Sequence, residues 1–168
     1  NGEILIVDGN SSDGTPALVK ELGFKVLTQD GKGYGDAMKT GVKHSNGDII
    51  ITFDADGSYD PKDISHLVEG IDDDNDVVFS SRYLPQSGSH DDTFIRYIGN
   101  MLFTFLLNII HGVGISDSLF LYIAAKKEVF ELINMQSTGF EYCIEFPIKV
   151  KKLGFKYKEI PSFERERL

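Results

Sequence analysis

Two aspartates, Asp54 and Asp56, stand one residue apart in the run FDADGSYDP and have the spacing to hold a divalent cation. In extended backbone, side chains two positions apart point to the same side, so both carboxylates can face one ion. Mg²⁺ and Mn²⁺ favour carboxylate and phosphate oxygens, and such an ion stabilises a departing diphosphate. The alternative is a solvated turn, because Asp and Gly are common turn residues.

Other polar features follow the apolar runs that read as strands. Asp8 closes the run EILIVD, and Arg82 follows DVVFSS. A guanidinium at a strand end can pair with a diphosphate, and the alternative is an ion pair with the acidic turn at residues 72–74. The glycine-rich loop, with Lys32 and Gly33, either cradles phosphate or only permits tight backbone turns.

The order of apolar runs and helical patterns predicts an α/β domain with a mostly parallel sheet and helices on both faces. Strands are expected at residues 3–8, 24–28, 48–53, 76–80, 119–125 and 155–160. Helices are expected at about residues 15–22, 36–44, 61–71, 126–133 and 141–153. Ligands of such sheets bind beyond the carboxyl ends of the strands. Asp8, Asp54 and Asp56 are therefore expected on one rim.

Length and composition favour one soluble globular domain, residues 1–168, with 41% hydrophobic and 26% charged residues. A net charge of -9 argues against a nonspecific nucleic-acid binder. Residues 1–93 hold 7 basic and 18 acidic residues, whereas residues 94–168 hold 10 and 8. The lone Cys143 excludes a disulfide within the chain and fits a reducing compartment.

Residues 94–110 form an apolar, aromatic segment in which Arg96 is the one charged residue. A segment of this composition can lie in a membrane interface. The alternative is a buried core helix. No run of 18 uncharged apolar residues is found, and no signal peptide is visible at the N-terminus.

Several runs taken in order resemble the family 2 glycosyltransferases of GT-A fold, and within them the dolichol-phosphate mannose synthase group. These runs are IVDGNSSDGT, GKGYGDAMKTG, NGDIIITFDADGSYDP, DVVFSSRYL and GFEY. The resemblance extends from about residue 3 to residue 166. Family members usually have an extra strand and helix before the segment equivalent to Glu3, and this sequence starts without that first strand.

The resemblance implies a donor site in the first half of the chain. Asp8 matches the acid that contacts the nucleoside base, and Lys32 and Gly33 lie in the loop beside the nucleotide. Asp54 and Asp56 match the metal-binding pair, so Mg²⁺ or Mn²⁺ is the implied cofactor. Residues 1–93 are accordingly expected to form the nucleotide-sugar-binding half, and residues 94–168 the half that faces the acceptor and the membrane.

The candidate catalytic residues are Asp56, Arg82, Asp117 and Glu141. Arg82 matches a basic residue near the donor and acceptor phosphates, and Asp117 matches a position beside the acceptor pocket or serves only as a strand cap. Glu141 falls near the general base of members that act on sugar hydroxyls. A phosphate acceptor needs little base, so the alternative for Glu141 is a structural role.

Two positions depart from the family pattern and bear on the metal and the donor. Gly9 stands where a second acid is common. Ser58 stands where mannose synthases often have Gln, a further metal ligand.

The function implied is an inverting transfer of mannose or glucose from GDP-mannose or UDP-glucose to a polyprenyl (dolichyl) phosphate. The enzyme is expected to be peripheral at the cytoplasmic face of a membrane, with no nucleic-acid partner. Alternatives are a transferase acting on a sugar hydroxyl, a nucleotidyltransferase, and a nucleotide-binding module without catalysis.

Overall fold

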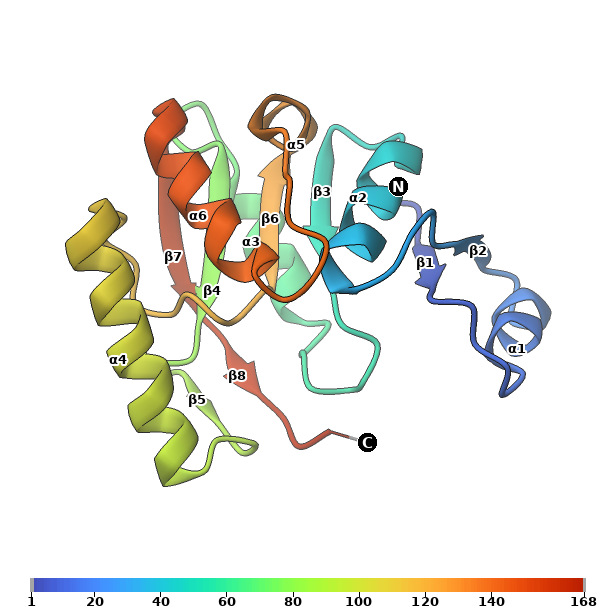
Figure 1. Ribbon diagram of the computed structural model, residues 1–168, viewed down its shortest axis with the longest axis horizontal. Coiled ribbons are helices and arrows are strands. Elements are labelled where there is room, and N and C mark those ends of the chain that lie inside the picture. Colours follow the sequence, from blue (N-terminus) through green and yellow to red (C-terminus); the bar gives the residue numbers. More distant parts are fainter. Residues whose placement is uncertain (1, 168) are drawn as a thin grey trace.

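A computed structural model describes residues 2–167 as a domain of helices and strands in alternation (Figure 1). The strands are β1 (Leu5–Asp8), β2 (Lys25–Thr28), β3 (Ile49–Thr52), β4 (Val77–Ser81), β5 (Gly88–Ser89), β6 (Ile123–Lys126), β7 (Tyr157–Pro161) and β8 (Phe163–Glu164). The helices are α1 (Thr15–Glu21), α2 (Tyr34–His44), α3 (Asp63–Gly70), α4 (Phe94–His111), α5 (Lys127–Ile133) and α6 (Tyr142–Leu153). The predicted elements are all present, although the strand expected at residues 119–125 begins only at Ile123.

Four strands form the central sheet in the order β3-β6-β4-β7. β4 and β7 pair in parallel, whereas β6 runs antiparallel to both of its neighbours. β3, β4 and β7 therefore point the same way and end at one edge of the sheet. The prediction of a mostly parallel sheet is confirmed, with β6 as its one reversed strand.

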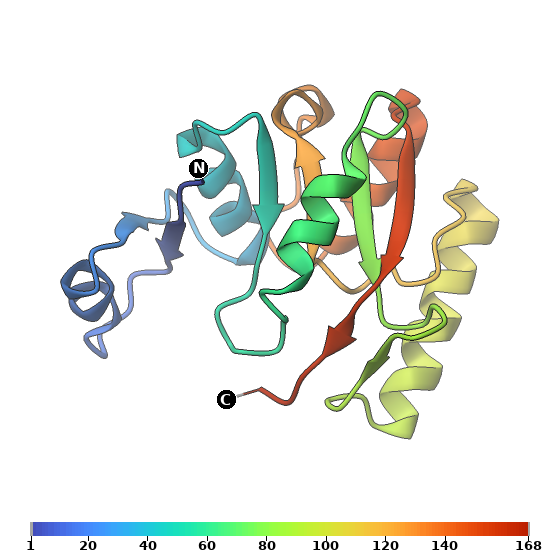
Figure 2. The ribbon, with the colours of Figure 1, turned by 180° about the vertical axis from the view of Figure 1, so that it is seen from behind.

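The alternation of side chains along the strands builds a core on each face of the sheet. Val77 and Phe79 of β4 lie in the larger core with the helices α5 and α6, whereas Val78, between them, lies in the smaller core with Leu67 of α3. Figure 2 shows α3 crossing the face opposite to α6. All four of these side chains are at most 2% exposed. Because β4 is covered on both faces, successive residues along it are apolar.

β1 and β2 form a separate parallel pair on the β3 side of the domain, and α2 packs against β1 (Figure 1). A β-carbon added at Gly41 of α2 would already lie 3.3 Å from the Val7 side chain. The first strand-helix-strand unit is therefore attached through α2 and does not extend the central sheet among residues 2–167.

α4 lies on the other side of the domain, beyond β7 in both ribbon views (Figures 1 and 2). The Thr93 hydroxyl caps its first turn by accepting from Arg96 N at 3.3 Å, and Gly112 ends it in a left-handed conformation with φ 65°. Thr104 and Leu107 are its buried residues, so one narrow stripe attaches α4 to the domain.

Candidate active site

Asp54 follows β3, and two phenols hold its half-buried carboxylate. Tyr34 Oη donates to Asp54 Oδ1 at 3.0 Å, and Tyr59 Oη donates to Oδ2 at 3.2 Å. Burial raises the pKa of Asp54, although both phenols stabilise the ionised form. A bound cation would offset the cost of keeping this charge away from water.

Asp56 is oriented by the turn that follows it. Its Oδ1 accepts from Ser58 N at 3.0 Å and from Ser58 Oγ at 2.6 Å, and Gly57 permits the turn with φ 84°. Burial opposes ionisation, but the Ser58 hydrogen bonds and Arg167 outweigh it and lower the pKa of Asp56. Asp56 is therefore a carboxylate whose Oδ1 is engaged by Ser58 and whose Oδ2 faces Arg167 Nε at 3.4 Å.

The two aspartates fit a divalent cation that takes its other ligands from elsewhere. Among residues 2–167, no group of three or more His, Cys, Asp or Glu side chains is arranged to hold a metal. Ser58, the position expected to affect metal coordination, uses its hydroxyl to orient Asp56. Mg²⁺ commonly binds through one or two carboxylates together with water and substrate phosphates. The chemistry of this pair matches that mode.

Arg82 follows β4 and is 8% exposed, with its guanidinium fixed by two acids. Arg82 Nε and Nη2 form a fork to Asp117 at 2.7 and 3.0 Å, and Nη1 donates to Glu164 at 3.0 Å. Burial opposes the charge, but Asp117 and Glu164 raise the pKa of Arg82, so it remains protonated. The ring of Phe120 lies 4.9 Å from its central carbon. Asp117, 1% exposed, thus accepts two of the three hydrogen bonds that hold the Arg82 guanidinium.

Residues that follow β3 and β4 line one cavity of about 100 Å³. Its lining combines carboxylates, guanidinium groups and aromatic rings. It includes Tyr34, Asp54, Ser58, Tyr59, Arg82, Phe120, Phe140, Cys143, Glu164 and Arg167. Asp54 and Arg82 thus line the same cavity, whereas Asp8 and Asp56 are not among its lining residues. A carboxylate that can hold a cation and a guanidinium are both suited to a diphosphate.

The expected nucleotide-binding residues lie outside this cavity. The buried carboxylate of Asp8 ends β1 and accepts from Asn10 N and Ser11 N, both at 2.9 Å, and hydrogen bonds from Ser11 lower its pKa. Lys32 is exposed. Gly33 has φ 93°, and a β-carbon there would collide with the Thr138 carbonyl. Glycine is thus required at position 33 for backbone reasons, whatever it binds.

Glu141 and Asp54 line different cavities. The Glu141 carboxylate is exposed and accepts from Gly139 N at 3.1 Å, and it lines a cavity of about 460 Å³ between the end of α4 and α6. His111 and Lys152 line the same cavity. A role as a general base at the Asp54 cavity has no direct support from this placement.

Several residues of the site were not expected from the sequence. Tyr34 and Tyr59 lie inside the two runs that suggested phosphate and metal binding, but nothing in those runs indicates that their phenols reach Asp54. Glu164 and Arg167 lie beyond the last expected strand, more than 80 positions from Arg82. The pairing of Glu164 with Arg82 and the contact of Arg167 with Asp56 depend on the chain path through β8, which no local pattern encodes.

Comparison with solved structures defines the class of the fold as GT-A glycosyltransferase. The Mycobacterium tuberculosis glucosyl-3-phosphoglycerate synthase, crystallised with Mn²⁺, UDP and glucosyl-3-phosphoglycerate, superposes with a TM-score of 0.74. The match covers 99% of this chain and 60% of that one, at 18% identity. The predicted fold is confirmed.

The chain belongs to glycosyl transferase family 2, whose sequence model matches residues 1–133. It is 31% identical to the polyprenol monophosphomannose synthase of Mycolicibacterium smegmatis, over 98% of this chain and 67% of that protein. It is 33% identical to the low-salt glycan biosynthesis hexosyltransferase Agl6 of Haloferax volcanii, over 98% of this chain and 41% of that protein. The expectation of a glycosyltransferase is confirmed at the level of the family.

Proposed function

We propose that this chain forms the catalytic domain of a divalent-metal-dependent, inverting hexosyltransferase that uses a polyprenyl phosphate as acceptor. The donor is a nucleoside-diphosphate hexose, GDP-mannose or UDP-glucose. The observation that supports this most directly is the cavity that Asp54, after β3, and Arg82, after β4, line together. The similarity to a polyprenol monophosphomannose synthase supports the choice of acceptor.

The roles of the residues follow from their placement. Asp54 and Asp56 Oδ2 would hold the cation, which when bound neutralises the diphosphate and makes it a better leaving group. The buried guanidinium of Arg82 supplies a fixed positive charge where negative charge develops on that diphosphate. Tyr34 and Tyr59 keep Asp54 in one orientation by donating to its two oxygens. Asp8, Lys32 and Gly33 would contact the nucleoside side of the donor.

A donor panel tests this proposal. Hexose transfer to a polyprenyl phosphate is measured with GDP-mannose and with UDP-glucose, in Mn²⁺, in Mg²⁺ and in EDTA. We expect turnover with one donor and its loss in EDTA. An absence of transfer with every donor would contradict the assignment, whereas donor binding without turnover would support a nucleotide-binding module.

The position of Glu141 supports a phosphate acceptor over a sugar hydroxyl. A phosphate oxygen is already nucleophilic at neutral pH and needs no strong base. The Glu141→Gln variant is therefore expected to keep its turnover with polyprenyl phosphate within about twofold of wild type. The measurement is kcat at saturating donor and acceptor. A loss of about 10²-fold or more would indicate that Glu141 is a general base and would favour the sugar-hydroxyl alternative.

α4 supplies the surface through which we propose that the domain meets the cytoplasmic face of a membrane. Its 18 residues have a mean hydropathy of 1.3, so that it is long and apolar enough to cross a bilayer, and 11% of them are buried. However, Thr104 Oγ1 lies 2.9 Å from Ser118 Oγ, and Asn108 Nδ2 donates to Ile115 O at 2.7 Å. These polar contacts hold α4 along the domain, which favours a helix in the membrane interface.

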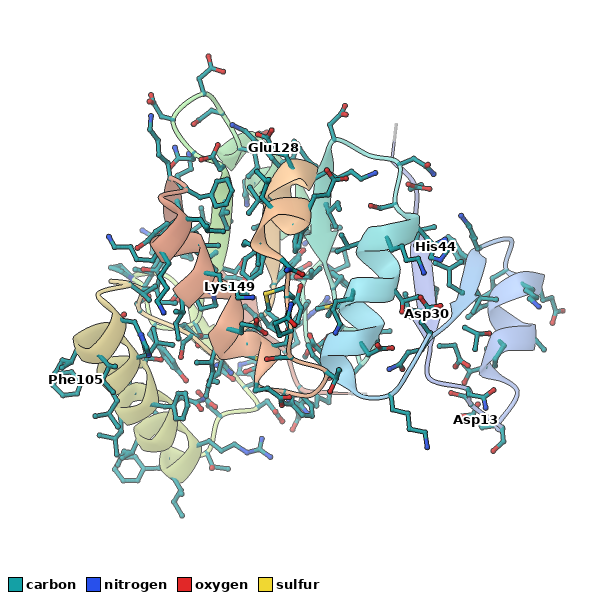
Figure 3. All side chains as sticks on the ribbon, turned by 45° about the horizontal axis from the view of Figure 1, so that its top comes forward. Asp13, Asp30, His44, Phe105, Glu128 and Lys149 are labelled. Carbon is teal, nitrogen blue, oxygen red and sulfur yellow. The ribbon has the colours of Figure 1, made fainter. Side chains whose placement is uncertain are left out.

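The outer face of α4 is apolar over its whole length. Figure 3 shows Phe105 projecting away from the domain, and its side chain is 57% exposed. Leu102 and Ile109, on the same face, are 56% and 65% exposed. Replacing these three residues by Gln is expected to weaken binding to vesicles at least about tenfold, because each apolar side chain contributes on the order of 1 kcal/mol on insertion. Vesicle sedimentation measures this.

A matched control replaces three exposed leucines outside α4, namely Leu22, Leu132 and Leu153. We expect this variant to bind vesicles as the wild type does. Equal binding by both triple variants would contradict a membrane role for α4. The content of anionic lipid is varied in the same experiment, because the basic residues of the second half would add an attraction that salt weakens.

A further inference from the structure

The segment after β8 lies against the loop that holds the two aspartates. Arg165 N donates to Ser58 O at 2.8 Å, and Arg165 Nη2 donates to Tyr59 O at 2.6 Å. β8 itself pairs in parallel with β5, and His90 N donates to Glu164 O at 2.9 Å. The path of the main chain is thus fixed on both sides of Glu164, and it delivers Arg167 to the cavity.

Arg167 faces the oxygen of Asp56 that a cation would use. Asp56 Oδ1 is engaged by Ser58, and Arg167 Nε lies 3.4 Å from Oδ2. The same Nε lies 3.2 Å from Asp91 Oδ2. The Arg167 side chain is 58% exposed, so that it has room to move. A divalent cation bound at Asp56 would therefore compete with this guanidinium for one carboxylate oxygen.

We propose that Arg167 is an exchangeable counter-ion of Asp56: the divalent cation displaces it, and the released guanidinium then binds the donor diphosphate. This inference rests on the metal site of the proposed function. An ion pair between partly exposed groups contributes little, so that a divalent cation can displace it. The planar fork of arginine matches phosphate oxygens, and a diphosphate held by a cation at Asp56 would lie close to Arg167, which already contacts Asp56.

Asp91 lowers the free-energy cost of this exchange. Its Oδ2 also pairs with Arg96 Nη1 at 3.0 Å, and Arg96 donates in addition to the Asp91 carbonyl at 3.1 Å. Asp91 therefore keeps a counter-ion when Arg167 leaves. Arg167 pairs with both Asp56 and Asp91. When Arg167 leaves, the cation would stand beside Asp56 and Arg96 beside Asp91, so that each acid still has a positive charge nearby.

The test is the affinity of the full chain for Mn²⁺ alone, followed by its affinity for UDP and GDP at saturating Mn²⁺. Free Mn²⁺ is measured by electron paramagnetic resonance and nucleotide binding by calorimetry. Arg167→Gln is expected to bind Mn²⁺ about two- to fivefold more tightly without nucleotide, because its competitor is gone. The same variant is expected to bind the preferred nucleoside diphosphate about tenfold or more weakly, because a charged hydrogen bond to phosphate is lost.

Two further variants make the outcomes distinguishable. Lys62→Gln removes one positive charge near the same loop, where Lys62 is exposed and forms no ion pair among residues 2–167; it is expected to leave both affinities unchanged. Asp56→Asn is expected to weaken Mn²⁺ binding. If Asp56→Asn weakens it and Arg167→Gln does not strengthen it, the exchange is wrong while the metal site stands. If Asp56→Asn has no effect, the metal site of the proposed function is wrong, and the exchange with it.

Discussion

Replacing Asp56 by Asn is expected to lower kcat/KM for hexose transfer about 10²- to 10³-fold, the usual effect of removing one electrostatic contact to a transition state. Asn keeps an oxygen that accepts from Ser58, so the turn and the fold should survive. What it loses is the negative charge at Oδ2. The rate is measured as a function of Mn²⁺ concentration, and part of the loss should be recovered at high Mn²⁺ because the variant binds the ion more weakly.

Asp54→Asn is expected to have an effect at least as large, for an additional reason. An amide has one oxygen, so that only one of the two phenols, Tyr34 or Tyr59, can still donate to it. The side chain then loses both its charge and its fixed orientation. The amide nitrogen would face a phenol oxygen and could turn the group away from the cavity.

Asp60→Asn is the control for both variants. Asp60 lies in the same loop, and its Oδ1 accepts from Lys62 N at 3.1 Å, a bond that Asn retains. Its rate should remain within about twofold of wild type, in line with the small effect of most surface substitutions. Wild-type rates in Asp56→Asn at low Mn²⁺ would mean that these aspartates form only the solvated turn that the sequence left open.

The sequence allowed the prediction of single residues at strand ends better than the prediction of their partners. Asp54 and Arg82 stood out because each follows an apolar run that was expected to be a buried strand, and Asp117 stood out through the family resemblance. That Asp117 forms a fork with Arg82 could not be predicted, because the two are separated by 35 positions and meet only when β6 enters the sheet beside β4. Local patterns specify where strands end, whereas partners depend on topology.

The direction of β6 could not be predicted from the sequence either. The apolar segment before Lys126 has the same composition whether its strand runs parallel or antiparallel, since both faces of β6 are covered. Ala124 and Ala125 are fully buried on opposite faces of the sheet, in the smaller and the larger core respectively. Apolar character alone therefore predicted a buried strand and left its direction undetermined.

The sequence left two environments open for α4, a membrane interface and a buried core. The exposure of its residues excludes the buried core. Ile95 and Phe94 are 83% and 76% exposed, values that a core helix does not show. Thr104, Leu107 and Asn108 contact the domain, whereas most of the other apolar side chains of α4 are exposed. An exposed apolar surface of this extent is typical of an interaction surface.

Asp117→Asn is expected both to destabilise the protein and to weaken donor binding. The Asp117 carboxylate accepts three hydrogen bonds from Arg82, namely from N, Nε and Nη2. Its replacement leaves a buried guanidinium with Glu164 as its close partner. Removing one member of a buried ion pair costs about 3 kcal/mol or more when the remaining charge is left uncompensated, and because Glu164 still pairs with Arg82 we expect a loss of up to about that size. Thermal unfolding measures this loss.

The effect on function separates a residue that positions Arg82 from one that only stabilises the fold. With Asp117→Asn, Arg82 can turn away from the cavity, so that KM for the donor should rise about tenfold at a temperature where the protein is still folded. Arg82→Lys should show a similar rise, because an ammonium keeps the charge but cannot form the fork. A structural role alone would lower the melting temperature without moving KM.

Glu159→Gln is the matched control for Asp117→Asn. Glu159 is another half-buried carboxylate next to this site, and it accepts from Ser116 N and Ser116 Oγ, both at 2.8 Å, without contacting Arg82 among the described residues. Gln preserves an acceptor for both bonds, so KM for the donor should stay at the wild-type value. If Asp117→Asn and Glu159→Gln gave the same donor KM as the wild type, the orientation of Arg82 would not depend on Asp117. The diphosphate would then have to be held mainly by the cation at Asp54 and Asp56, and the buried guanidinium would serve only to join β4 to the loop before β6.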